Sequence, residues 1–481
     1  MEALSKSLDE AQKTLTELLG INKSFDVGQR EIIVMNRRLQ IYYVNGLVDS
    51  EIVVNLITQL LWLNNVQSPE TEVFNAIHNR LVHQQVALTK SYDQIGTDVL
   101  SGLIAIVLDG ETTGFIIDVR SYPGRGPAEP DTEKTVRGSR DGYTENIIVN
   151  TALTRRRIRT GKLCNEIFKV GYESKTDVAM MYIEGTADPA VVADIRERIK
   201  QVEVDGLTMT DKELEEFITK QRYNPYPLVR YTERPDVVAT HLYQGMVAII
   251  VDTSPSVILA PITLFDHLAG VEEYRQTPAV GTFLRLIRFG GILTSLLLIP
   301  TWILFMIHPE FLPNSISFIS PQQEGNFSLV FQVLIAELGI EFVRMASIHT
   351  PSAISSALGL VSALLIGQAA VDIGLFGSEI LFFVALGTLG GFVTPSYELG
   401  LANKMFKILM IITTALLGIW GYLGSMLLGL IYLSRVKSFG KPYLYPLIPL
   451  NLSELLKSTI RVTCPYQYKQ RQKKKKISID K

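Results

Sequence analysis

Two carboxylates inside an apolar stretch are the residues whose type and spacing point most directly to chemistry. Glu337 and Glu341 are four residues apart, which places them on one face of a helix, and Arg344 follows one turn later. Carboxylates replace the hydration that a cation loses in a narrow path, and they repel anions. The pattern has two interpretations: a stripe that lines a cation pathway, or a pair between Glu341 and Arg344 that locks two helices together. A pathway would expose the carboxylates to water, whereas a lock would bury them.

The surrounding sequence predicts a helical membrane domain. Residues 289–307 form a run of 19 residues without a charge, which as a helix rises roughly 28 Å and matches the hydrocarbon core of a bilayer. A second uncharged run covers 408–433, and a turn near 420–424 would make it two arms, each too short to span by itself. Three further apolar segments lie between these runs: 327–342, 352–370 and 380–392. We therefore expect about five or six segments, with Asp372 and Glu379 near their outer ends as a mouth or as solvated charges.

Charges outside the apolar runs predict the orientation. Arg275, Arg285 and Arg288 precede the first run, and no Lys or Arg follows it directly, which places the N-terminal region on the cytoplasmic side. The N-terminus lacks the basic start and apolar run of a secretory signal. The tail contains a predicted amphipathic helix at 452–460 and four lysines at 473–476, which favour anionic lipid headgroups or act as a solubilising end. A lipid bilayer is thus an expected partner.

The sequence of the N-terminal half predicts two α/β subdomains with the same order of helices and strands. The stretch 42–49 recurs at 181–188, and both copies end in an aspartate, Asp49 or Asp188, that suits a helix N-cap. A second pair, 102–109 and 245–252, predicts strands that begin hairpins. We expect an α/β soluble N-terminal region with two duplicated subdomains, followed by an α-helical transmembrane bundle. The expected divisions are 1–125, a connecting segment at 126–170, 171–282, a membrane domain at 283–436 and a basic cytoplasmic tail at 437–481.

The connecting segment carries many charges but no recognisable catalytic motif. An acidic patch is followed by a helix rich in arginine, and such a cluster either holds phosphate groups or pairs with nearby carboxylates. The candidate subunit or interdomain contacts are Arg125, Glu129, Asp131, Arg137, Arg140, Arg155, Arg156 and Arg157. The glycines nearby do not form a phosphate loop, because no Gly-Lys-Ser/Thr follows at the required spacing.

The composition argues against several classes of protein. A formal net charge of −2 disfavours a nucleic-acid binder, since binding to the backbone requires a positive excess. The two cysteines, Cys164 and Cys464, are far apart, and the six histidines lack the spacing of metal ligands. No nucleophile, base and orienting group can be assembled. We therefore expect no enzyme activity, no metal and no cofactor.

Several motifs resemble the A subunits of bacterial spore germinant receptors, the GerA family. They cover nearly the whole chain: Arg125, 129–133, 136–142, 144–146, 150–159, 224–227, 231–236, 251–256, 273–274, 348–351 and 394–399. Within the family, 121–125, 136–142 and 272–285 look most like a branch named for sporulation rather than for nutrient sensing. The resemblance implies a protein of the spore inner membrane, with its duplicated soluble region on the core side, that acts in germination.

The resemblance also implies oligomers that conduct ions together with other membrane subunits. Our first hypothesis is an oligomeric ion-conducting subunit that contributes to ion release, with Glu337, Glu341, Arg344, Asp372 and Glu379 as candidate pore-lining or gating residues. The alternative is a non-conducting scaffold or sensor that assembles germination proteins. A secondary transporter would require inverted repeats, which the sequence does not contain. The sequence leaves open whether a small-molecule germinant binds.

Overall fold

The computed structural model describes residues 3–65, 73–81, 86–121, 137–221, 223–312, 319–320, 327–349 and 367–461. The chain forms two compact units. The first contains Met1–Arg222, Leu228–Ile262 and Ser438–Gly440, and the second contains Tyr223–Pro227, Thr263–Lys437 and Lys441–Lys481. The short segment Ser438–Gly440 therefore belongs to the first unit although the chain on both sides of it belongs to the second.

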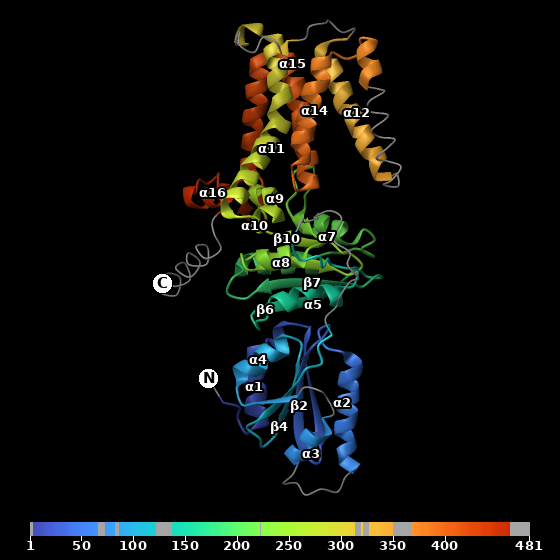
Figure 1. The fold of residues 1–481 in the computed structure, drawn as a ribbon, viewed down its shortest axis with the longest axis vertical. Coiled ribbons are helices and arrows are strands. Elements are labelled where there is room, and N and C mark those ends of the chain that lie inside the picture. The colour runs from blue at the N-terminus through green and yellow to red at the C-terminus, as the bar shows by residue number, and fades with distance from the viewer. Residues whose placement is uncertain are drawn as a thin grey trace. The chain divides into compact units, whose positions relative to one another are not determined.

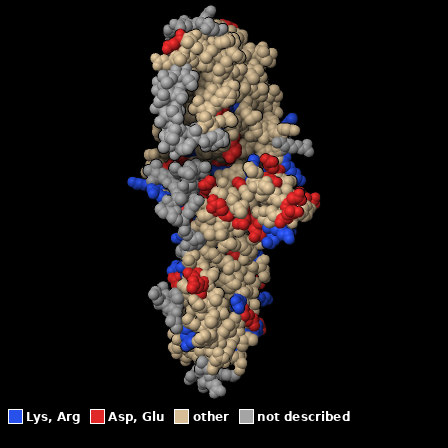
Figure 2. Space-filling view, turned by 90° about the vertical axis from the view of Figure 1, so that its right-hand side faces the viewer, with Lys and Arg blue, Asp and Glu red and all other residues tan. Residues whose placement is uncertain are grey.

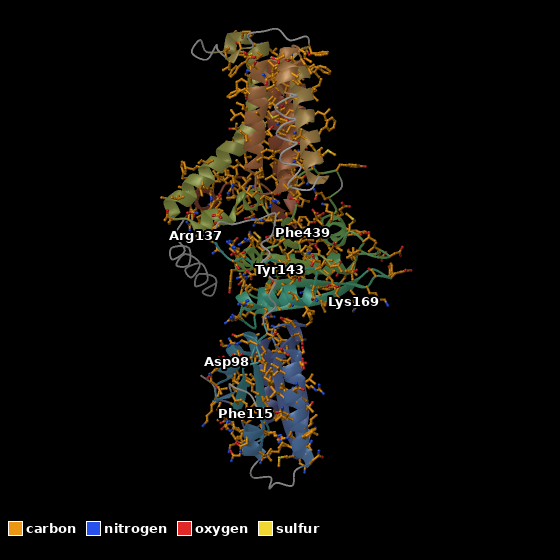
Figure 3. All side chains as sticks on the ribbon, turned by 45° about the vertical axis from the view of Figure 1, so that its right-hand side comes forward. Asp98, Phe115, Arg137, Tyr143, Lys169 and Phe439 are labelled. Carbon is orange, nitrogen blue, oxygen red and sulfur yellow. The ribbon has the colours of Figure 1, made fainter. Side chains whose placement is uncertain are left out.

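The first unit begins with a five-stranded sheet that is covered on both faces (Figure 1). Its strands are β1 (Val27–Val34), β2 (Arg37–Val44), β3 (Val86–Thr89), β4 (Ile104–Leu108) and β5 (Gly114–Ile117), in the spatial order β1-β2-β4-β5-β3. One core joins the sheet to α1 (Leu8–Leu19) and α4 (Tyr92–Leu100). The other core joins the opposite face to α2 (Ser50–Trp62) and α3 (Val73–Arg80) and contains Phe115 (Figure 3).

A second sheet in the same unit repeats this plan. Its strands are β6 (Leu163–Val170), β7 (Thr176–Ile183), β8 (Arg230–Thr232), β9 (Val247–Val251) and β10 (Val257–Ala260), in the order β6-β7-β9-β10-β8. α6 (Pro189–Lys200) and α7 (Thr210–Thr219) pack into the core on one face. α5 (Ile147–Arg157) and α8 (Pro235–Leu242) contact the strands as well. Element for element, the order of helices and strands is the same in both halves, which confirms the duplicated α/β fold.

Local sequence signals explain where the equivalent helices begin. The Asp49 carboxylate accepts hydrogen bonds from the backbone N–H groups of Glu51 and Ile52. The Asp188 carboxylate accepts from the N–H of Ala190, and Pro189 occupies the first helical position, where the absence of an N–H costs nothing. Asp49 therefore lies between β2 and α2, and Asp188 lies between β7 and α6, where each caps the helix that packs on its sheet.

The second unit is helical. A short helix, α10 (Val271–Arg275), precedes α11 (Pro278–Ile307), and these are followed by α12 (Leu329–His349), α14 (Ser378–Phe392), α15 (Tyr397–Arg435) and α16 (Leu452–Thr459). α9 (Leu264–Leu268) begins the unit's main segment. Among the described residues, α11 and α15 are long and apolar enough to cross a membrane. On the face in view in Figure 2, the upper helical region is almost free of charged side chains. The expected segment at 352–370 lies mostly outside the described residues.

α15 is two helices that meet at Gly418. The backbone there has φ 56° and ψ −135°, which is not helical. A Cβ added to Gly429 would lie 2.3 Å from the ring of Phe406, whereas these positions would be roughly 34 Å apart in a straight helix. The chain therefore reverses at Gly418, two residues before the expected turn. The arms are longer than expected because the first begins at Tyr397.

Candidate functional site

Five charged side chains of α12 and α15 form one cluster inside the helical unit. We call it the α12–α15 charge cluster: Glu337, Glu341, Arg344, Lys404 and Lys407. Lys407 Nζ lies 2.5 Å from Glu337 Oε1, and Lys404 Nζ lies 3.3 Å from Glu337 Oε2. Glu341 pairs with both Lys404 and Arg344. Each carboxylate is thus neutralised by cations, and the ion pairs join α12 to the first arm of α15.

Burial distinguishes the two carboxylates. Glu337 is 1% exposed and Lys407 is 4% exposed, so that their charges depend on each other for stabilisation. Glu341 and Arg344 are partly accessible, and the Arg344 guanidinium lies 5.2 Å from the centre of the Tyr397 ring. The expected pair between Glu341 and Arg344 is present, but Lys404 and Lys407 were not among the candidate residues. Their pairing is a tertiary contact for which the sequence carries no local signal.

The other candidate pore residues lie at a different level along the helices. Gln332 Oε1 accepts a hydrogen bond of 3.1 Å from the N–H of Gly377, just before α14 begins. Asp372 is exposed, and Glu379 is half-buried in the first turn of α14. Glu341 is nine residues beyond Gln332, roughly 13 Å along α12. Asp372 and Glu379 therefore lie near the other end of α12 from Glu341.

The arginines of α5 have three different environments. Arg155 is fully buried, and its Nε and Nη2 lie 2.9 and 3.2 Å from the carboxylate oxygens of Asp26. It also donates to the carbonyl oxygen of Leu163 at the start of β6, so that it joins the two halves of the first unit. Arg157 pairs with Asp141 at 2.5 Å, whereas Arg156 is exposed.

The candidate contact arginines outside α5 form no buried ion pair in the described part of the chain. Arg137 and Arg140 are exposed (Figure 3 labels Arg137). Arg125, Glu129 and Asp131 lie outside the described residues. Arg155 and Arg157 pair with Asp26 and Asp141, and the acidic patch of the connecting segment lies outside the described residues.

A buried carboxylate at the base of α11, Glu273, was not among the candidate site residues. Glu273, in the first turn of α10, is fully buried and pairs with Arg285 at 2.7 Å and with Arg288. The Arg285 guanidinium also lies 5.7 Å from the centre of the Tyr274 ring. Arg285 and Arg288 were interpreted only as orienting charges before the first apolar run. They also fix α10 against α11.

The chemistry of these groups is electrostatic and structural. In the described part of the chain, no three His, Cys, Asp or Glu side chains lie close enough together to hold a metal ion. Cys164 is buried, and burial raises the pKa of its thiol. A buried thiol with a raised pKa is a poor nucleophile, because the thiolate is the reactive form.

Comparison with known proteins gives one consistent result. The family model of the Bacillus/Clostridium GerA spore germination protein matches residues 13–474. Stage V sporulation protein AF of Bacillus subtilis (strain 168) is 50% identical over 93% of this chain and 91% of its own length. Spore germination protein KA of the same organism is 29% identical over 96% of this chain and 84% of its own.

A solved structure is also similar to part of the chain. The N-terminal domain of the A subunit of the Bacillus megaterium spore germinant receptor GerK3 aligns with a TM-score of 0.42 at 28% identity, covering 54% of this chain and 96% of that chain. The sporulation branch indicated by 121–125, 136–142 and 272–285 is that of stage V sporulation protein AF, and the 50% identity confirms the resemblance. These relatives are sporulation and germination proteins rather than members of an enzyme family. The chain belongs to the GerA family of spore germination proteins.

Proposed function

We propose that this protein is a membrane subunit of a spore germination complex and that its copies, together with other membrane subunits, form an ion-conducting assembly. The chain would lie in the spore inner membrane as a multi-pass protein, with the N-terminal unit and the basic tail on the core side. Family membership supports the role in germination. The two long apolar helices and the three arginines before the first uncharged run support the membrane placement.

The observation that carries ion conduction is the α12–α15 charge cluster. Ionisable groups within membrane helices are costly, and they mark ion pathways more often than lipid-facing surfaces. In this arrangement Glu337 and Glu341 are held by lysines. Their role would be that of a gate: separation of α12 from the first arm of α15 frees two carboxylates to attract cations, and closure neutralises them again.

One specific observation favours a second candidate function. Glu337 is almost completely buried against Lys407, which fits a permanent lock between two helices. With such a lock, the protein would be a non-conducting scaffold that assembles germination proteins, and its soluble unit would bind a partner or a small ligand.

Ionic conductance of cells that express the protein with its membrane partners distinguishes the two functions. Wild type is compared with Glu337→Gln and Glu341→Gln at equal abundance in the membrane, with Glu173→Gln, an exposed carboxylate of the first unit, as the control outside the cluster. A conducting assembly gives a wild-type conductance whose size or selectivity changes in the first two variants. A scaffold gives intact oligomers and no conductance in any of the four.

A further inference from the structure

The helix α16 and the turn before it expose a row of large apolar side chains. Leu452, Leu456 and Ile460 recur every four residues, so that they share one helical face, and they are 63%, 49% and 48% exposed. Leu447 and Leu450 in the preceding turn are exposed as well. In α16 itself no residue is buried. A helix with one exposed apolar face requires an apolar environment outside the chain or a partner that covers it.

Hydrogen bonds fix α16 beside the lower part of α11 (Figure 1). Arg285 Nη1 donates to the carbonyl oxygens of Lys457 at 3.1 Å and Ser458 at 2.9 Å. Arg461, which follows the helix, donates through Nη2 to the carbonyl oxygen of Tyr274 at 2.7 Å. Arg285 is itself buried and held by Glu273. The level of α16 along α11 is therefore set by the position of Arg285.

That level corresponds to the boundary of a bilayer. Arg285 is four residues before Phe289, where the uncharged run begins, so the two are roughly 6 Å apart along the helix axis. The headgroup region on each side of the hydrocarbon core is about 5–7 Å thick. The same part of α11 also exposes the apolar side chains of Phe283 and Leu286.

The charges beside this surface suit an anionic lipid. Lys457 and Arg461 flank the apolar row, and Glu454, the acidic residue of α16, pairs with Lys457 at 3.2 Å. The sequence beyond this helix adds Arg471 and the lysines at 473–476. Basic residues beside an apolar helical face are typical of helices that lie in the membrane interface.

We propose that α16 is an interfacial helix that inserts Leu452, Leu456 and Ile460 into the headgroup region of an anionic bilayer, parallel to its surface. Such a helix ties the base of α11 to the lipid and resists its movement along the membrane normal. The proposal uses the membrane placement of α11 given under the proposed function, and it does not depend on ion conduction.

Site-directed spin labelling of the full-length chain tests this placement. The protein is reconstituted in nanodiscs of phosphatidylcholine and phosphatidylglycerol, with Cys464 replaced by serine and the buried Cys164 retained; this background alone should take up no label. Single cysteines are introduced as Leu456→Cys, on the apolar row, and Glu454→Cys, a partly exposed position on the opposite face of the helix. Leu293→Cys, exposed within the uncharged run of α11, reports the membrane placement itself. Collision with oxygen, which concentrates in lipid, is compared with collision with a water-soluble nickel chelate.

The expected result is a Leu456→Cys label that favours oxygen, at a depth about 5–10 Å below the surface, and a Glu454→Cys label that favours nickel. A water-exposed label at 456 beside a lipid-exposed label at 293 overturns the interfacial helix and leaves the membrane placement standing. Labels accessible to nickel at both positions overturn both. A label at 456 that is shielded from both reagents means that a protein surface covers α16, which also contradicts the proposal.

Discussion

Lys407 Nζ lies 2.5 Å from Glu337 Oε1, although the two residues are 70 positions apart in the sequence and belong to different helices. Both are almost fully buried. A buried ion pair contributes little net stability, but loss of one partner leaves an uncompensated charge in a poorly hydrated site. Loss of either residue alone therefore leaves a buried charge between α12 and α15 without its closest partner.

Replacement of one residue of the Glu337–Lys407 pair should lower the free energy of unfolding more than replacement of both. Glu337→Gln leaves Lys407 without its closest carboxylate, and we expect a loss of about 3–5 kcal/mol. The double variant Glu337→Gln with Lys407→Met should recover much of that loss. Thermal unfolding of the full-length protein in nanodiscs measures the series, with the exposed Asp372→Asn as control. Additive losses in the double variant would show that the pair does not act as a unit.

Gly418 should tolerate no side chain. Its backbone conformation is essentially restricted to glycine, and an added Cβ would lie 2.5 Å from His308 Nε2. Gly418→Ala should therefore cost at least about 1–3 kcal/mol and lower the yield of monodisperse protein. Gly424→Ala is the matched control, because a Cβ there meets nothing within 4 Å.

The backbone strain and the steric clash at Gly418 can be separated. His308→Ala removes the ring that the new Cβ would meet but leaves the backbone strain. Gly418→Ala combined with His308→Ala should therefore recover only part of the yield. Equal yields for Gly418→Ala and Gly424→Ala would contradict a reversal of the chain at Gly418.

The buried pair between Arg155 and Asp26 should control the stability of the first unit. Arg155→Met leaves Asp26 buried without its cation, and we expect a loss of about 3–5 kcal/mol. Arg156→Met changes the exposed neighbour on the same helix and should stay within about 0.5 kcal/mol. Urea unfolding of the full-length protein, followed by proteolysis of the soluble unit, compares the two. Similar midpoints for both variants would exclude Arg155 as the residue that joins the subdomains.

One carboxylate gives the second subdomain a defined pH dependence. Burial alone would raise the pKa of Glu166, but hydrogen bonds from Arg196 and Tyr182 outweigh burial and lower it below the usual 4.5. A lowered pKa in the folded state means that the stabilisation is present above pH 4.5 and is lost as the pH falls through the folded-state value.

The Glu166→Gln variant isolates this contribution. The wild type should be more stable than the variant at neutral pH, and the difference should shrink as the pH falls below about 4.5. Unfolding midpoints between pH 7 and pH 3 measure the difference. A difference that stays constant over this range would show that ionisation of Glu166 does not stabilise the fold.

Local signals explain why the fold class could be predicted. The aspartate N-caps and the apolar strands before them recur in both halves, and each signal is complete within about ten residues. The short edge strands β3 and β8, of four and three residues, escaped prediction. Apolar length predicted α11. The reversal in α15 could not be located in the same way, because Gly418, Gly421 and Gly424 lie close together and packing decides which of them turns the chain.

The candidate site was only partly predictable for the same reason. Helical spacing brings Glu337, Glu341 and Arg344 together, since it depends on local geometry alone. The pairing with Lys404 and Lys407 depends on how α12 packs against α15, which local spacing does not contain. Likewise, Arg155 stands in a run of three arginines, and only the packing of the two subdomains makes it the buried one.

The most direct test of the central claim is a recording of current across a planar lipid bilayer that contains the purified protein with its co-purified membrane subunits. The proposed function predicts stepwise currents whose cation selectivity falls when Glu337 and Glu341 are both replaced by glutamine. The absence of such currents, with intact oligomers recovered from the same membranes, would contradict ion conduction and leave the scaffold as the function.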